Sequence, residues 1–304
     1  MRIKKMLLIV IVFITGASCS FFQSKSDNVD DFLPRETDVP GWIMKDSVQS
    51  YTGANIKKYN QDYAGIGIER LSSSVYKSLY ESLYNLDVKI KVEVIRFDSV
   101  LSAYGFFSVI RGHGIFDIGD INEFSSSKLS IIRRGNYVVY SSTEDESPLI
   151  QEDLTTFSKI PFNYIGENYM NYKLPGSLNI LKGADGYGII YSINKHEKFS
   201  SLERIAYTQW KWNNNLINVF YSEYGSFYDA YEVFKENIVD NYIVSSSDEI
   251  YTAFKKDSDG KYIFISVRDN CIFGGWSIEK YNDMNKIHNE ILKRIDDYNK
   301  QNTK

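Results

Sequence analysis

Cysteine and histidine are scarce in this 304-residue sequence, which has two cysteines and three histidines. Cys19 and Cys271 lie far apart, and no two of His113, His196 and His288 stand at the spacing of metal ligands. Zinc and iron sites in proteins are built from clusters of these residue types. We therefore expect no metal ion and no other cofactor.

Motifs of common enzyme classes are also missing. The sequence has no Gly-x-Ser-x-Gly nucleophile elbow and no Walker-type loop. The glycine-rich stretch 182–188 lacks the residue order of a phosphate-binding loop, and a turn explains it better. A hydrolytic pair of carboxylates cannot be chosen from 39 acidic residues, because such a pair is defined by its separation in space. The sequence names no catalytic residue.

Long apolar runs are limited to the N-terminus. Residues 6–14 form an unbroken apolar run of nine, after a start that carries Arg2, Lys4 and Lys5. At about 1.5 Å per residue, nine residues do not cross a hydrocarbon core of about 30 Å. A basic start, a short apolar run and small residues after it are typical of a secretory signal, which we place at residues 1–18.

Cys19 follows the small residues at the end of this signal. In this respect the segment resembles a bacterial lipoprotein signal, in which the cysteine is acylated, for example with palmitate, and becomes the first mature residue. Gly16 stands where such signals usually carry an aliphatic residue, and the alternative is ordinary secretion with a coincidental cysteine. By the same resemblance, Ser20 rather than Asp after the cysteine favours the outer membrane. Residues 19–32 would then be the lipidated cysteine and a polar tether, with the membrane as partner.

The charge balance argues against nucleic acid as a partner. Residues 1–18 hold three of the 35 basic residues and none of the 39 acidic ones, so the rest of the chain has a net charge of −7. An acylated Cys19 would leave Cys271 as the one free thiol, which excludes an intrachain disulfide. Cys271 lies in an apolar run, so we expect a buried side chain rather than a nucleophile.

A weak internal duplication is the most informative feature of the body. Residues 92–107 and 219–234 show the same order of residue types, with a strand-like segment before a helix-like one. Ser99 and Ser226, which are 127 positions apart, stand where a helix N-cap belongs. Four pairs are identical: Ser99 and Ser226, Ala103 and Ala230, Tyr104 and Tyr231, Phe107 and Phe234.

Flanking hairpin patterns extend each copy. Residues 129–141 after the first helix and 250–267 after the second each read as two strands around a turn. We predict an α+β fold of two antiparallel strand-strand-helix-strand-strand units, at residues 33–160 and 161–304. Apolar residues at three- and four-residue steps over 278–298 add an amphipathic C-terminal helix, on which His288 is expected beside the polar face.

Several short motifs resemble a family of uncharacterised bacterial exported proteins. They are Val-Pro-Gly-Trp at 39–42, Ser-Ala-Tyr-Gly-Phe-Phe-Ser at 102–108, Gly-Asn-Tyr-Val-Val at 135–139 and Leu-Pro-Gly-Ser-Leu at 174–178. The resemblance covers roughly residues 33–270. This family has no assigned activity, so the resemblance implies no functional residue.

Two groups of side chains are candidate binding sites. Trp210 and Trp212 share one side of an expected strand, and Tyr207 and Tyr221 could add to a surface that stacks on sugar rings. Burial in a core is the commoner role of such tryptophans. The second group, Asp117, Asp120 and Glu123, could bind calcium on a loop, although its spacing does not match an EF-hand.

The sequence therefore favours an envelope-anchored, non-catalytic module that binds an unknown envelope protein or glycan. One alternative is a hydrolase that uses carboxylates in a cleft between the two units. Another is an assembly role, in which the C-terminal helix docks on a second protein.

Overall fold

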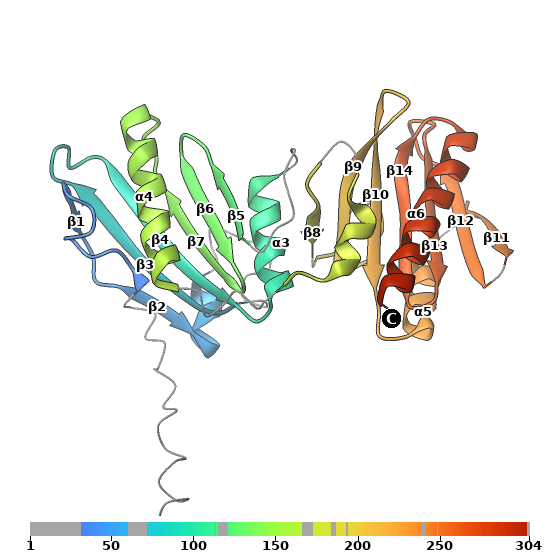
Figure 1. Cartoon of the computed structure of the whole chain (residues 1–304), viewed down its shortest axis with the longest axis horizontal. Helices are drawn as coiled ribbons and strands as arrows, with labels where there is room; N and C mark the ends of the chain where they lie inside the picture. The colour runs from blue at the N-terminus through green and yellow to red at the C-terminus, as the bar shows by residue number, and fades with distance from the viewer. Residues whose placement is uncertain are drawn as a thin grey trace, which may run out of the picture.

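The structure is a computed structural model that describes residues 32–59, 72–112, 114, 121–165, 173–183, 187–192, 194–238, 241–247 and 249–302. The expected signal, Cys19 and the tether up to residue 31 lie outside the described residues. The described chain forms two antiparallel sheets that lie side by side along the long axis of the molecule (Figure 1).

The first sheet has the strand order β1-β3-β4-β7-β6-β5, and β2 also pairs with β3. Its elements are β1 (Trp42–Met44), β2 (Gln49–Thr52), the 3-10 helix η2 (Gly53–Tyr59), β3 (Ser72–Ser82), β4 (Lys89–Phe97), α3 (Val100–Arg111), β5 (Ile121–Ser125), β6 (Leu129–Arg134), β7 (Tyr137–Ser142) and α4 (Pro148–Ile165).

The second sheet has the order β11-β12-β13-β14-β10-β9-β8. Its elements are the 3-10 helix η4 (Gly176–Leu181), β8 (Ile190–Ser192), β9 (Ile205–Trp212), β10 (Asn215–Glu223), α5 (Phe227–Asn237), β11 (Ile243–Ser247), β12 (Ile250–Lys256), β13 (Tyr262–Arg268), β14 (Cys271–Ile278) and α6 (Tyr281–Asn302).

The predicted fold class is confirmed, and so is the amphipathic C-terminal helix. Ser99 and Ser226 cap α3 and α5, since their Oγ atoms accept hydrogen bonds from the N–H groups of Ser102 at 3.0 Å and Asp229 at 3.1 Å. The apolar stripe of α6 is buried against the second sheet. The expected division at residues 160 and 161 falls inside α4, which packs on the first sheet.

The match between the hairpins differs from the sequence prediction. The prediction treated residues 129–141 and 250–267 as equivalent hairpins. In the structure β6 and β7 are equivalent to β13 and β14, because β7 is hydrogen-bonded to β4 and β14 is hydrogen-bonded to β10. An asparagine clamp marks the same place in both units. Asn136 Nδ2 donates to the Phe97 carbonyl at 2.8 Å, and Asn270 Nδ2 donates to the Tyr224 carbonyl at 2.9 Å. Three strands follow α3 and four follow α5 among the described residues, instead of two each.

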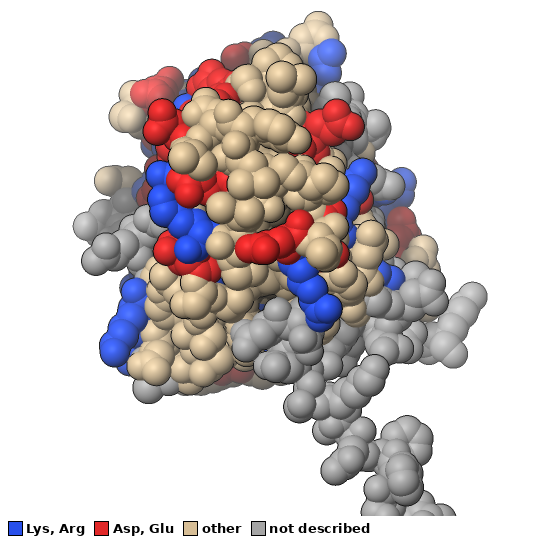
Figure 2. Space-filling view, turned by 90° about the vertical axis from the view of Figure 1, so that its left-hand side faces the viewer, with Lys and Arg blue, Asp and Glu red and all other residues tan. Residues whose placement is uncertain are grey.

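Each sheet is covered by one helix on each face. In the first unit α4 buries Leu154 and Phe157 on one face, and α3 buries Phe106 and Phe107 on the other. In the second unit α6 covers the face that corresponds to α4, and α5 covers the face that corresponds to α3. The core under α6 includes Ile291, and the core under α5 includes Ala230 and Phe234. The outer end of the first unit shows basic and acidic groups interspersed among uncharged ones (Figure 2).

Candidate ligand pocket at the junction of the two units

Helix α3 of the first unit packs against β8, the edge strand of the second sheet (Figure 1). Tyr104 Oη donates to the Ile189 carbonyl oxygen at 2.7 Å, and the Tyr191 N–H donates to Ser108 Oγ at 3.0 Å. Gly105 permits this approach, because a Cβ there would lie 3.0 Å from the Tyr191 carbonyl oxygen. These contacts hold the two units together, and we call this place the junction.

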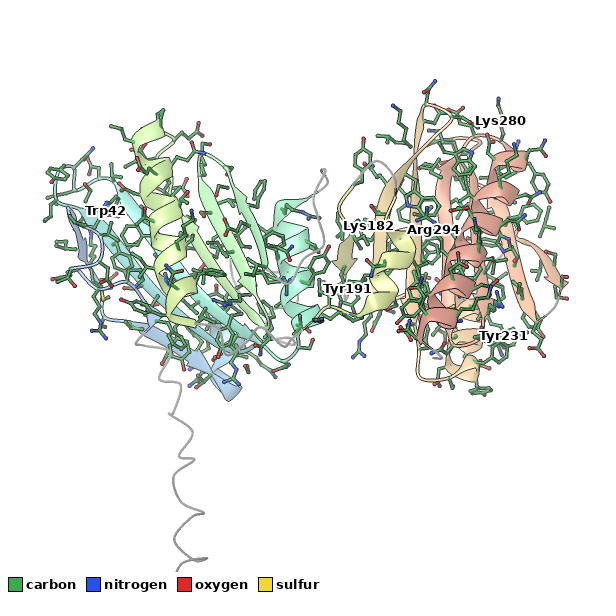
Figure 3. The ribbon with its side chains drawn as sticks, in the orientation of Figure 1. Trp42, Lys182, Tyr191, Tyr231, Lys280 and Arg294 are labelled. Atoms are coloured by element: carbon green, nitrogen blue, oxygen red, sulfur yellow. The ribbon has the colours of Figure 1, made fainter. Side chains whose placement is uncertain are left out.

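A pocket of about 280 Å³ opens beside the junction. Leu101 of α3, Leu178 of η4 and Ala206 of β9 supply aliphatic lining, and Tyr191 and Tyr221 supply rings. Figure 3 shows Tyr191 between the two halves of the molecule. Ligand pockets in proteins are commonly apolar with a few polar groups at fixed positions. We refer to this cavity as the junction pocket.

Arg204 and Glu223 are the charged side chains that line the junction pocket, and both are exposed. Arg204 has a φ of 57°, in the left-handed region that costs a non-glycine residue about 1–2 kcal/mol. Ser222 Oγ donates to the Arg204 carbonyl oxygen at 3.3 Å and helps to hold this backbone. Within the described residues the Arg204 guanidinium makes no ion pair and no hydrogen bond.

The hydroxyl of Tyr191 has no hydrogen-bond partner within the described residues either, although the side chain is only 8% exposed. Burial raises the pKa of Tyr191 to about 12, and the nearby Arg204 cation opposes that rise. Tyr191 therefore stays protonated at neutral pH and acts as a donor. Burial also raises the pKa of Tyr221, which lines the same pocket.

A second depression, of about 390 Å³, adjoins the junction pocket and shares Arg204 and Glu223 with it. Glu203 and Asp229 also line this depression, and all three carboxylates are exposed. The general acid of a carboxylate pair needs a raised pKa, which burial usually supplies. No buried carboxylate lines either cavity among the described residues.

A larger depression, of about 410 Å³, lies between η4 and the end of α6. Its cation is already engaged, since Arg294 Nε donates to Glu290 Oε1 at 2.8 Å and Nη1 donates to the Lys182 carbonyl oxygen at 2.6 Å. The Arg294 guanidinium also lies 4.5 Å from the centre of the Trp210 ring. This arrangement braces α6 against η4 and β9, and engages the cation of this depression.

The four aromatic residues predicted to stack on sugar rings do not share one exposed surface. Trp210 is 4% exposed, its Nε1 donates to the Leu181 carbonyl oxygen at 2.8 Å, and Arg294 covers its ring. Tyr221 is buried and Trp212 is half-buried in the same core under α6. Tyr207 points to the opposite face of β9, beside Trp276.

The structure describes some of the other predicted site residues but not all of them. Asp117 and Asp120 lie outside the described residues, and Glu123 is an exposed residue of β5. Cys19 also lies outside them. Cys271 is buried and free, as predicted, and burial raises its pKa to about 12.

Two of the three histidines can be placed, and one prediction about them is wrong. His288 is half-buried on the inner side of α6, with Nε2 3.2 Å from Thr252 Oγ1, instead of beside the polar face. His196 lies against the rings of Tyr207 and Trp276. His113 lies outside the described residues.

Sequence patterns did not identify Arg204 or Tyr191. Neither belongs to a recognisable motif, and their role depends on contacts with residues about 100 positions earlier in the chain. The Leu-Pro-Gly-Ser-Leu segment at 174–178 was a partial signal, since Pro175, Ser177 and Leu178 line the pocket.

Comparison with known proteins gives little more. No family model matches the chain, and no curated protein matches it. This chain has a distant similarity to one solved structure, crystal form I of TP0453. The match covers 83% of this chain and 92% of the TP0453 chain, with 8% sequence identity and a TM-score of 0.27.

Membrane-spanning helices and metal-binding clusters are both absent from the described part of the chain. None of the helices described there is both long enough and apolar enough to cross a membrane. No group of three or more histidine, cysteine, aspartate or glutamate side chains is placed there to hold a metal ion.

Proposed function

We propose that this chain is a lipid-anchored protein of the bacterial cell envelope, and that it is a non-catalytic binding module whose junction pocket receives an apolar group of the ligand. The observation that carries the binding proposal is the junction pocket, with its apolar lining of Leu101, Leu178 and Ala206. The anchor rests on Cys19 and the signal before it, and Ser20 favours the outer membrane.

The position of the pocket supports binding. Its walls come from both units and from η4 between them, so an occupant would contact all three parts. The assembly alternative has less support, because the apolar stripe of α6 is already buried on its own sheet, at Met284, Ile287, Ile291 and Ile295.

A neutral apolar dye tests this proposal. The full chain carrying Cys19→Ser, used without detergent, is titrated with N-phenyl-1-naphthylamine, whose fluorescence rises in apolar surroundings. Leu101 is partly exposed at the pocket, so Leu101→Trp fills the cavity with little change to the core. We expect about tenfold weaker dye binding, equal to about 1.4 kcal/mol, in this variant.

The matched control is Leu149→Trp, at an 82% exposed leucine near the start of α4 and outside the pocket. This control should bind the dye as the parent chain does. Absence of dye binding, or equal affinity of the Leu101→Trp variant and the parent chain, would contradict the proposed function.

A further inference from the structure

We propose that the ligand of the junction pocket is an amphiphile with a single anionic group, which Arg204 and Tyr191 bind while the apolar part occupies the pocket. This inference rests on the proposed function and specifies the chemical class of the ligand. A carboxylate or a phosphate would satisfy it equally.

Two donors line the same pocket without an acceptor. The Arg204 guanidinium and the Tyr191 hydroxyl both lack a hydrogen-bond partner within the described residues. Both residues belong to the lining of the junction pocket, and the Arg204 cation opposes the rise in the Tyr191 pKa. Both groups are therefore free to donate to an anion, and charge-assisted hydrogen bonds are about twice as strong as neutral ones.

The backbone of Arg204 adds support. Its left-handed φ of 57° is unfavourable for a residue with a side chain, and residues held in such conformations cluster at functional sites. The Ser222 hydroxyl donates to the Arg204 carbonyl just before β9 and so helps to hold this backbone at the pocket.

The size of the cavity limits the ligand. At about 280 Å³ the junction pocket lies near the lower end of the range of roughly 300–1,000 Å³ for ligand sites. A short alkyl chain or a small aromatic molecule such as the neutral dye suits this volume, whereas a larger polycyclic molecule does not.

Glu223 lines the pocket as well and would repel an anion. Its side chain is exposed, so water and salt screen this repulsion. Arg204 is equally exposed, and the Tyr191 hydroxyl lines the pocket as a second donor for an anion. The proposal therefore predicts that Glu223→Gln strengthens binding of an anionic amphiphile.

Isothermal titration calorimetry with matched eight-carbon ligands tests the charge preference. The probes are octanoate, octyl phosphate, octanol and octylammonium, added to the Cys19→Ser chain without detergent below their micellar concentrations. We expect octanoate and octyl phosphate to bind about tenfold more tightly than octanol, and octylammonium to bind most weakly. The comparison of carboxylate with phosphate shows which head group fits better.

Variants assign the effect to the two residues. Arg204→Gln should weaken octanoate binding about tenfold, and Tyr191→Phe severalfold, while octanol binding stays unchanged. Lys286→Gln and Tyr228→Phe are the controls, because both side chains are exposed and lie outside the pocket. Neither control should change any affinity.

The outcomes separate this inference from the proposed function. If octanol binds as tightly as octanoate, or if Arg204→Gln leaves octanoate binding intact, the anion preference is overturned and the apolar pocket stands. Tighter binding of octylammonium also overturns the inference. If neither the neutral dye nor any eight-carbon probe binds, both proposals fail.

Discussion

Tyr104 and Tyr231 occupy equivalent positions in α3 and α5, yet their surroundings differ. The Tyr104 hydroxyl is buried and donates to the Ile189 carbonyl across the junction. Tyr231 is half-buried, packs on Phe227 and Tyr251, and its hydroxyl makes no hydrogen bond within the described residues. One tyrosine holds the units together, and its counterpart packs on aromatic rings within the second unit.

Replacing each tyrosine by phenylalanine tests this difference. Tyr104→Phe should lower the free energy of unfolding by about 1 kcal/mol, the usual net worth of a buried hydrogen bond. Tyr231→Phe should change it by less than about 0.5 kcal/mol, as expected for a substitution that removes no bond. Urea unfolding monitored by circular dichroism measures both, and equal losses in the two variants would refute the assignment.

His288 makes stability depend on pH. Burial beside Phe264 and Phe273 lowers its pKa below 6.5. The unfolded chain therefore binds a proton at a higher pH than the folded chain does, and stability falls as the pH drops below 6.5. The fall ends once the pH is below the depressed folded-state pKa.

The variant His288→Gln should lose this part of the pH dependence, since glutamine does not titrate. Burial also lowers the pKa of His196, so some dependence should remain. Urea unfolding at pH 7.5, 6.0 and 5.0 compares the two chains. Superimposable pH profiles of the parent and the variant would show that His288 is not responsible.

At the scale of elements, the asparagine clamps hold corresponding turns in both units. Asn136 and Asn270 each join the β6–β7 or β13–β14 turn to the end of the strand before a helix, at Phe97 and Tyr224. In both places the backbone N–H of the strand residue also donates to the asparagine carbonyl, at 2.8 Å. The two clamps are a shared feature of the duplicated units.

Removing either amide should therefore have a similar effect. Asn136→Ala and Asn270→Ala should each lower the free energy of unfolding by about 1 kcal/mol, since each loses one side-chain hydrogen bond. Chemical denaturation of the two single variants measures this. A large cost at one position with none at the other would argue against equivalent roles.

The sequence predicted the repeated elements better than the parts that complete them. Ser99 and Ser226 carry local capping signals, so α3 and α5 could be predicted. Helix α4 was not, because Pro161 interrupts its pattern, and burial of Phe157 on the sheet outweighs that penalty. The hairpins were misaligned because, among the described residues, four strands follow α5 and three follow α3, and the local pattern does not place the additional strand.

The site could hardly be predicted at all. A pocket arises from the packing of segments distant in the chain, such as Leu101 beside Leu178 and Ala206, and periodicity reports only local structure. Trp210 and Trp212 do lie on the same face of β9, as predicted. That face belongs to the core, because α6 and η4 cover Trp210.

At the scale of the molecule, the proposed acylation of Cys19 would place the junction pocket at a membrane surface. Acyl chains contribute about 0.8 kcal/mol for each buried CH₂ group, so several chains anchor a protein firmly. Cells that express the full chain should incorporate labelled palmitate into it and retain it in the membrane fraction. Cys19→Ser should abolish both, with Cys271→Ser as the matched control, and retained label in Cys19→Ser would contradict lipid attachment at this residue.

The central claim is that the apolar group of a ligand lies in the junction pocket, between the two units. The most direct measurement is the anomalous diffraction of bromine from crystals of the Cys19→Ser chain grown with 8-bromooctanoate. The account predicts one bromine position in the cavity lined by Leu101, Leu178 and Ala206, with the carboxylate toward Arg204. Bromine beside Arg294 and η4, on another surface or at no defined position would contradict it.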